Sequence, residues 1–258
     1  MIKDIINYTK VKDLLLYSII IYKIDHYKQN LNLQDIINNN HNINNNKLLL
    51  DNLSELNKND YILKYFYCDI SNIFCFIIKN DINKEIKIIF RGTTNEINII
   101  DNLNIKQKEI IFLENNNIKI HEGFYTQIFK GKLYNNIKNY LQSLNIINYH
   151  IYCSGHSLGG IMSTLLGYFL SYVFKNNKII IVSFGSSRIG NKHFFKSFEN
   201  IHNLICYRIC NNNDLITQLP ILNYKHVGIP IILSNNYFNL LINHTSESYL
   251  INLLNNNW

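Results

Sequence analysis

The chain has 258 residues, 47% of them hydrophobic, so it can bury the core of one domain of the larger α/β type. Its formal net charge of +7 admits an anionic membrane or a nucleic acid as partner. However, no basic run is interleaved with aromatic residues, so we expect no nucleic-acid binding. Neither a CxxC nor an HExxH motif occurs, so we expect no metal and no cofactor.

The cysteines and the amino-terminal segment bear on location. Five cysteines without a pairing pattern suit a reducing compartment. The stretch "LLLYSIIIY" (14–22) is too short to span a bilayer, and no small-residue cleavage site follows it. We therefore predict a buried or amphipathic first helix, without signal peptide or transmembrane helix, in a cytoplasmic or membrane-peripheral protein. The sequence leaves the oligomeric state open.

Apolar runs alternate with helical stretches along the chain. The predicted elements are a helix over 1–30, an Asn-rich loop at 38–46, helix and loop over 47–67, strands near 73–78, 86–90 and 118–120, a helix over 124–142, a strand at 150–154, a helix over 158–175, strands at 179–183 and 204–209, and a final helix from about 246. Almost wholly apolar strands between helices predict an α/β fold with a mostly parallel central sheet, flanked by helices on both faces. We expect one domain over 1–258, in which 1–60 form a helical lead-in and the Asn-rich loop.

The stretch "SGHSLGG" (154–160) joins a predicted strand to a predicted helix through a sharp turn. Gly155 and Gly159 stand two residues before and after Ser157. Such a turn brings strand and helix so close that both flanking positions must lack a side chain. This G-x-S-x-G pattern predicts a nucleophile elbow that presents the Ser157 hydroxyl at the end of a strand.

A serine nucleophile needs a histidine base and an acid that orients the base. In hydrolases built on this elbow, the chain order is Ser, then Asp or Glu, then His. Asp214 is the one aspartate after Ser157, and it follows the strand at 204–209. His226 and His244 come later; a base on a late loop favours His244, with His226 as the alternative.

Two further features belong to this prediction. The backbone N–H of Leu158 and Thr93, in the turn "FRGT" (90–93), are the expected oxyanion donors. The segment 94–105 can form a short helix with a broad apolar face that includes Ile97, Ile99 and Ile100. It is either a lid over the serine or a permanently packed surface helix.

Taken together, these motifs give the chain a family likeness. In order and spacing it resembles the class 3 (fungal and plant) lipases over roughly 68–255, through "FRGT", "HEGF", "SGHSLGG", "SFGSSRIGN", "NDLITQLP", "YKHVG" and "NHTSESYL". The resemblance implies an α/β-hydrolase fold, with Ser157 as nucleophile, Asp214 as acid, His244 as base and Thr93 in the oxyanion hole. His226 matches a noncatalytic histidine of the family. The chain departs from the family at Ser187, where proline is usual, and at Ile99, where the lid usually has tryptophan.

Three functions remain open at this point. The first is a serine hydrolase that cleaves carboxylic esters of lipids, an acylglycerol lipase, which meets a membrane or lipid-droplet surface transiently. The second is a phospholipase acting on anionic membranes, which would suit the basic charge. The third is a noncatalytic lipase-like module that binds lipid or protein; it should have lost a triad residue, yet all three candidates are present.

Overall fold

A mostly parallel sheet organises the chain in the computed structural model, which describes residues 6–24, 47–93, 106–110, 117–234 and 242–256. Within these residues, seven strands form one sheet in the order β1-β2-β3-β6-β7-β8-β9. The strands are β1 (Tyr61–Cys68), β2 (Ile73–Asn80), β3 (Glu85–Phe90), β6 (His150–His156), β7 (Ile179–Phe184), β8 (Leu204–Asn211) and β9 (Ile229–Leu233). From β3 to β9 all pairs are parallel, while β1 and β2 are added antiparallel. A separate antiparallel pair consists of β4 (Gln107–Glu109) and β5 (Lys119–His121).

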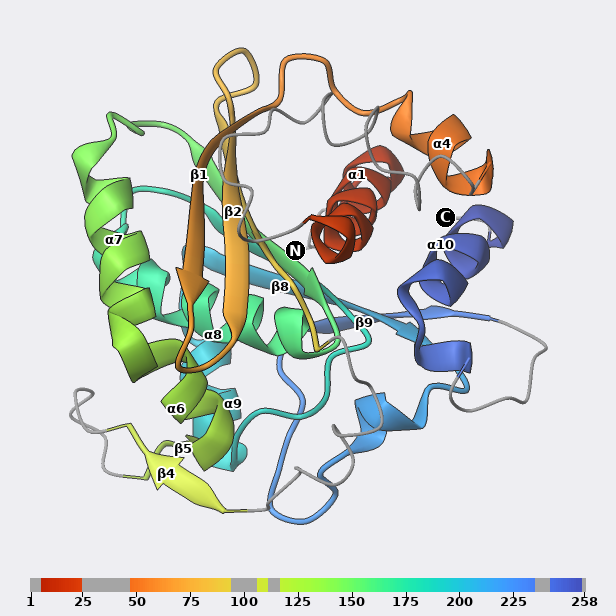
Figure 1. The fold of residues 1–258 in the computed structure, drawn as a ribbon. Coiled ribbons are helices and arrows are strands. Elements are labelled where there is room, and N and C mark those ends of the chain that lie inside the picture. Colours follow the sequence, from red (N-terminus) through yellow and green to blue (C-terminus); the bar gives the residue numbers. More distant parts are fainter. Residues whose placement is uncertain (1–5, 25–46, 94–105, 111–116, 235–241, 257–258) are drawn as a thin grey trace.

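Helices cover both faces of the sheet (Figure 1). One face carries α1 (Tyr8–Ile20), α4 (Lys47–Leu53) and α10 (Ser246–Asn255). The other carries α6 (Glu122–Phe129), α7 (Leu133–Ser143), α8 (Leu158–Val173) and α9 (Lys192–Glu199). Short 3₁₀ turns complete the chain: η1 (Ile21–Lys23), η2 (Lys130–Lys132), η3 (Leu215–Gln218) and η4 (Ile242–His244). The predicted α/β architecture with helices on both faces is confirmed.

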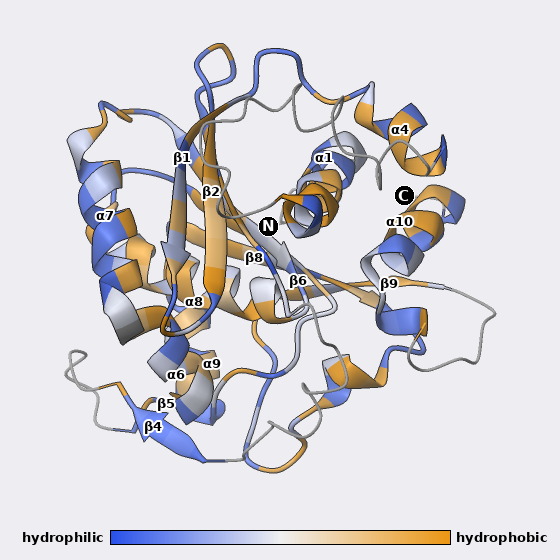
Figure 2. Cartoon of the chain, in the orientation of Figure 1, coloured by the Kyte–Doolittle hydropathy of each residue, from blue (hydrophilic) through white to orange (hydrophobic). Residues whose placement is uncertain are grey.

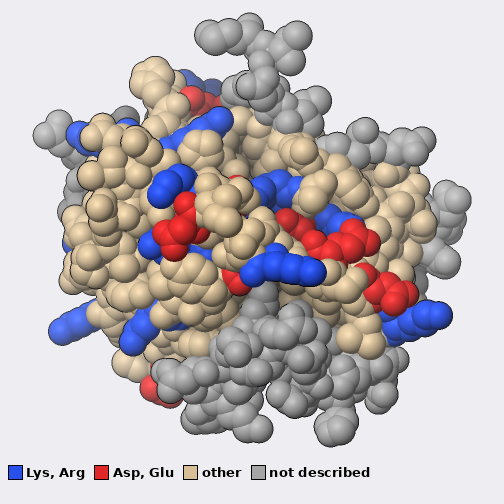
Figure 3. Space-filling model, turned by 90° about the horizontal axis from the view of Figure 1, so that it is seen from above, with Lys and Arg blue, Asp and Glu red and all other residues tan. Residues whose placement is uncertain are grey.

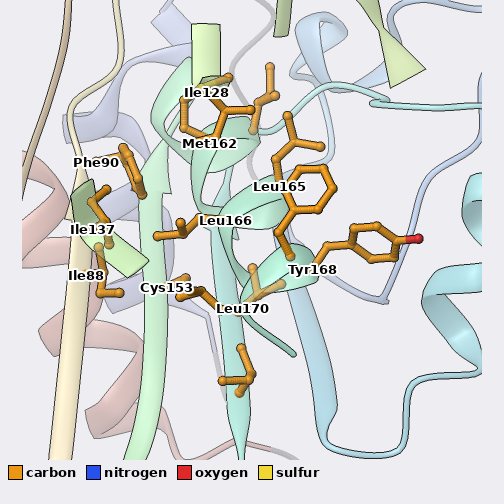
Figure 4. Packing of buried hydrophobic residues seen from close by; sticks show 14 of the residues in the cluster. Ile88, Phe90, Ile128, Ile137, Cys153, Met162, Leu165, Leu166, Tyr168 and Leu170 are labelled. Carbon is orange, nitrogen blue, oxygen red and sulfur yellow. The ribbon is translucent and has the colours of Figure 1, made fainter. Parts of the chain in front are cut away.

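The apolar strands explain this arrangement, because alternate side chains of a strand point to opposite faces. Ile88 and Phe90 of β3 and Cys153 of β6 pack against α8, whose Leu166 lies among them (Figure 4). Ile89, between the first two, joins the core under α1 instead. Both faces are therefore apolar, and Figure 2 shows β2 and β9 in orange but the exposed β4 in blue.

Helix α1 is enclosed by the rest of the protein. Every residue from Val11 to Ile20 is buried, and the side chain of Asn7 caps the helix by accepting from the N–H of Thr9. This matches the predicted buried first helix. Within the described ranges, no helix combines the length and the hydrophobicity needed to cross a membrane.

Several predicted boundaries were wrong. Helix and loop were expected over 47–67, but Tyr61–Cys68 form the edge strand β1, whose half-polar sequence pairs with β2. The helix expected over 124–142 is broken at Gly131 and Lys132, which have φ of 62° and 61°. Strands β4 and β9 and helix α9 were not predicted. Residues 25–46, which include the Asn-rich loop, lie outside the described residues.

Candidate active site

The turn between β6 and α8 has the geometry of a nucleophile elbow. Ser157 adopts φ 57° and ψ −123°, a combination that side-chain-bearing residues rarely adopt. A Cβ on Gly155 would lie 2.4 Å from the carbonyl carbon of Gly159, and a Cβ on Gly159 would lie 2.4 Å from the carbonyl oxygen of Phe90. Both positions therefore require glycine, as the spacing predicted.

Three side chains from distant parts of the chain meet at this turn. Nε2 of His244, in η4, lies 2.8 Å from Oγ of Ser157, and Nδ1 lies 2.8 Å from Oδ2 of Asp214. Each of the three residues is no more than 2% exposed. With Nδ1–H donating to the carboxylate, Nε2 is free to accept the serine proton. This is the arrangement that nucleophilic acyl transfer requires.

The carboxylate of Asp214 has two further donors that fix its orientation. The hydroxyl of Tyr249 donates to Oδ2 at 2.7 Å, and the N–H of Ile216 donates to Oδ1 at 3.0 Å. Burial, and after it the charge of Asp214, raises the pKa of Tyr249 well above its ordinary value, so the hydroxyl stays protonated. The acid is therefore held from α10 and from η3 at once.

The predicted oxyanion donors come from the start of α8 and from the turn after β3. Leu158 is the first residue of α8, so its N–H is among those that have no acceptor within the helix. Thr93 is half-buried and follows Gly92, where a Cβ would lie 2.6 Å from the carbonyl oxygen of His156. The turn that carries Thr93 thus packs directly against the residue that precedes the serine.

His226, the alternative base, lies away from this cluster. It lines a small cavity together with Arg208, Ser187 and Cys206. Burial, followed by the charges of Arg208 and Arg188, lowers its pKa to about 3, so it is neutral. Neither of its ring nitrogens has a hydrogen bond to Ser157 or Asp214 among the described contacts. The structure brings His244, not His226, to Ser157.

The predicted lid residues Ile97, Ile99 and Ile100 lie in 94–105, outside the described residues. As for metal ligands, the described part of the chain contains no group of three His, Cys, Asp or Glu side chains that could hold an ion. All five cysteines lie in the described part of the chain, where they are buried and form no disulfide bond.

Two site residues were not predicted, although both stand inside the motifs. His156 directly precedes Ser157, and its Nε2 lies 2.6 Å from the backbone oxygen of His244. Tyr249 stands in "NHTSESYL" and reaches Asp214 from the first turn of α10. The available signals were that His156 directly precedes the nucleophile and that Tyr249 stands five positions after the base. The contacts of both residues depend on the fold.

Comparisons with known proteins agree with this geometry. The chain is 27% identical over 152 residues to "Phospholipase A(1) DAD1, chloroplastic" of Arabidopsis thaliana, which covers 53% of this chain and 34% of that protein. It is 27% identical over 163 residues to "Secreted mono- and diacylglycerol lipase 1" of Fusarium solani, covering 61% and 46%. The matched region thus spans less than half the length of these curated relatives.

Among solved structures, the mono- and diacylglycerol lipase from Aspergillus oryzae superimposes with a TM-score of 0.72 at 22% identity, covering 90% of this chain and 81% of that one. This similarity shows the α/β-hydrolase fold. The family model of "Lipase (class 3)" matches residues 87–224, a range that includes Ser157 and Asp214. The chain therefore belongs to the class 3 lipase family.

Proposed function

We propose that this protein is a serine hydrolase that cleaves carboxylic esters of lipids, with acylglycerols as its substrates. The observation that carries this proposal is the unbroken chain of two 2.8 Å contacts from Ser157 through His244 to Asp214. All three side chains are buried, so bulk water does not compete for these hydrogen bonds. The relatives named as lipases support the same chemistry.

The geometry supports a two-step mechanism. His244 removes the hydroxyl proton while Oγ of Ser157 attacks the ester carbonyl carbon, and Asp214 stabilises the imidazolium that forms. The negative oxygen of the tetrahedral intermediate is stabilised by the N–H of Leu158 and by Thr93. His244 then protonates the leaving alcohol, which leaves an acyl ester on Ser157. Water, deprotonated by the same histidine, hydrolyses this ester and restores the serine.

Exposed apolar side chains beside the site support a lipid substrate. Leu215 follows Asp214 directly and is 51% exposed, and Ile242, two residues before His244, is 53% exposed. A lipid surface would cover such side chains at a gain of about 25 cal/mol per Å². We therefore propose a lipid or membrane surface as the transient partner.

A phospholipase is the second candidate. The net charge of +7 would favour anionic headgroups, and a phospholipase A(1) is among the relatives. Release of fatty acid from emulsified diacylglycerol and from phosphatidylglycerol vesicles distinguishes the two, because the acyl ester is common to both while the headgroup differs. We expect the higher kcat/KM on diacylglycerol; a higher value on the phospholipid would favour the second candidate.

The Ser157→Ala variant tests the proposed function. Loss of a triad nucleophile lowers kcat by several orders of magnitude. We expect neither hydrolysis of p-nitrophenyl butyrate nor labelling by a fluorophosphonate. Ser163→Ala is the matched control, since Ser163 is equally buried in α8 and its described hydrogen bond is to the carbonyl of Gly160. Full turnover by Ser157→Ala would overturn the assignment. An unreactive wild-type Ser157 would favour a noncatalytic binding module.

A further inference from the structure

A chain of hydrogen bonds leads from the end of the first helix to the loop of the catalytic histidine. The hydroxyl of Tyr22, in η1, lies 3.1 Å from Nδ1 of His156. Nε2 of His156 lies 2.6 Å from the backbone oxygen of His244. The rings of His156 and His244 are 5.0 Å apart, and His156 is fully buried. Tyr22 and His244, 222 positions apart along the chain, are thus linked through one side chain.

The acceptors fix the direction of both hydrogen bonds. A carbonyl oxygen can only accept, so Nε2 of His156 carries the proton and donates to His244. Burial, followed by the nearby His244, lowers the pKa of His156 well below its ordinary value, so the ring is neutral. Nδ1 is then an acceptor, and the hydroxyl of Tyr22 donates to it. Tyr22 therefore selects the tautomer that holds the His244 backbone.

The same hydroxyl lies against the turn that carries Thr93. A Cβ on Gly92 would lie 2.0 Å from the hydroxyl oxygen of Tyr22 and 2.6 Å from the carbonyl oxygen of His156. Only a glycine leaves this space to the tyrosine. The tyrosine is thus in contact with the oxyanion turn, with the residue before the nucleophile and, through His156, with the loop of the base.

We propose that Tyr22 and His156 are positioning residues. They hold the backbone of His244 where its Nε2 lies within hydrogen-bond distance of the Ser157 hydroxyl. This inference rests on the proposed hydrolase function. Without the bond to His156, the buried carbonyl of His244 would lose a hydrogen-bond donor, which costs free energy. The short turn η4 would then shift to recover a partner for this carbonyl. A displacement of about 1 Å in a catalytic group can slow the reaction about 100-fold.

The Tyr22→Phe variant removes one hydroxyl and keeps the ring. We expect kcat for p-nitrophenyl butyrate to fall about tenfold, with KM changed less than twofold, because the loss of one buried hydrogen bond weakens only the placement of the base. The rate of fluorophosphonate labelling should fall in parallel. Tyr152→Phe is the matched control: Tyr152 is a buried tyrosine of β6 under α1 and makes no described contact with the triad. It should retain the wild-type kcat.

Substitutions at His156 supply the second measurement. His156→Leu removes the donor to His244, while His156→Gln keeps an N–H donor for that carbonyl and an acceptor for Tyr22. We expect His156→Leu to lower kcat and His156→Gln to keep most of the wild-type kcat. The proton NMR signal of the Nδ1–H of His244, bound to Asp214, should shift or broaden in Leu and in Tyr22→Phe but not in Tyr152→Phe.

The outcomes separate this inference from the function on which it rests. If Tyr22→Phe keeps the wild-type kcat and the His244 signal, while Ser157→Ala is inactive, the positioning role is wrong and the hydrolase stands. If Ser157→Ala is active, the proposed function itself fails. If His156→Leu does not fold, Tyr22→Phe alone decides, because it leaves the volume of the core unchanged.

Discussion

Ser157 holds a backbone conformation that glycine adopts without strain and other residues avoid. Its φ of 57° with ψ of −123° costs about 1–3 kcal/mol for a residue with a Cβ. The strain persists because β6 and α8 are fixed by packing on both sides, and because the N–H of Ser157 donates to the carbonyl of Phe184 at 2.8 Å. The hydroxyl is thus displayed at the expense of local stability.

Comparison of two variants that lack the Ser157 hydroxyl measures this strain. Ser157→Ala and Ser157→Gly both lose the hydroxyl and its bond to His244, but only glycine loses the Cβ. Glycine is also more flexible when unfolded, which lowers its advantage by about 0.5–1 kcal/mol. We expect Ser157→Gly to be more stable than Ser157→Ala by about 1 kcal/mol in urea unfolding. A lower stability of Ser157→Gly would mean that the turn stores less strain than the flexibility of glycine costs, about 0.5–1 kcal/mol.

The two downstream histidines give a second prediction. His244→Ala removes the group that accepts the serine proton, so the esterase rate should fall as far as in Ser157→Ala. His226→Ala removes a neutral side chain beside Arg208 and should keep the rate within about tenfold, or 1.4 kcal/mol of barrier. The kcat of both variants on p-nitrophenyl butyrate decides. Reversed phenotypes would make His226 the base.

The residues differ in how well sequence could predict them. The proximity of Ser157, Asp214 and His244 could be inferred because the elbow has fixed glycine spacing and the order of the triad along the chain leaves few candidates. Tyr22 could not be inferred, since it lies 134 positions before His156 and belongs to an apolar run that sequence assigns only to the core. A tyrosine hydroxyl at the end of a buried helix has no local pattern.

Among the elements, α1 combines apolar burial with buried charges. Its Lys10 donates to Glu85 at 2.6 Å, and Tyr17 donates to Asp60 at 2.6 Å. Asp60 is also paired with Lys87, and neither of these two side chains is exposed. Removal of one partner would leave an uncompensated buried charge, which typically costs 3–5 kcal/mol. These contacts fix α1, and η1 with Tyr22 follows directly at its carboxyl end.

Asp13 in this helix predicts a pH dependence of stability. Burial raises its pKa to about 6 from 3.8; Lys87, Lys10 and Lys12 lower it and Asp60 raises it. Between these pH values the folded state keeps a proton that the unfolded state loses, so stability falls as pH rises through this window. Asp13→Asn avoids that loss. We expect it to stabilise the protein at pH 7.5 by at most about 3 kcal/mol, and not at pH 3.5.

Thermal unfolding at the two pH values measures this effect. Asp69→Asn, at an exposed aspartate after β1, is the control and should change the midpoint little at either pH. A gain from Asp13→Asn of the same size at both pH values would show that packing, rather than ionisation, is responsible.

Elements were predicted well where they are buried on both faces. Strands β6 and β7 and helix α8 are almost wholly buried, and their ends coincide with the Gly- and Asn-rich turns. Edge strands lack this signal. Most positions of β1 are exposed or half-buried, and β9 alternates half-buried and exposed positions before its buried last residue. The break between α6 and α7 depends on two left-handed residues, Gly131 and Lys132, of which only the glycine is visible as a signal.

At the scale of the molecule, two cores share one sheet. One core lies under α8, and the other lies under α1 and α10. Within the described residues one sheet thus joins both cores, while a single domain over 1–258 stays a prediction. The site forms where elements of both cores meet, since Ser157 begins α8 while His244 leads into α10. The apolar runs of the sequence predict each core. The place where the two cores meet, and with it the site, depends on the order of the strands in the sheet.

The net charge of +7 is unevenly distributed. The face seen from above in Figure 3 places Lys and Arg next to Asp and Glu. In contrast, a cleft of about 500 Å³ beside β5 and α9 is lined by Lys119, Lys192 and Lys225 and, among the described residues, by no carboxylate. These three lysines are exposed and have no described ion pair. The cleft therefore carries a local cluster of positive charge without a described acidic partner.

This distribution predicts where an anionic surface would be attracted. Each lysine near an anionic bilayer contributes about 1 kcal/mol, so replacing all three cleft lysines by glutamine should weaken binding to phosphatidylglycerol vesicles at least about tenfold. A control variant replaces three exposed lysines elsewhere, Lys64, Lys175 and Lys178, and lowers the net charge equally. Co-sedimentation in 50 mM NaCl measures binding, and 500 mM NaCl should abolish the difference between the variants by screening. Hydrolysis of p-nitrophenyl butyrate, a soluble neutral ester, should be unchanged in both. Equal loss of vesicle binding in both variants would mean that total charge, not the cleft, attracts the surface.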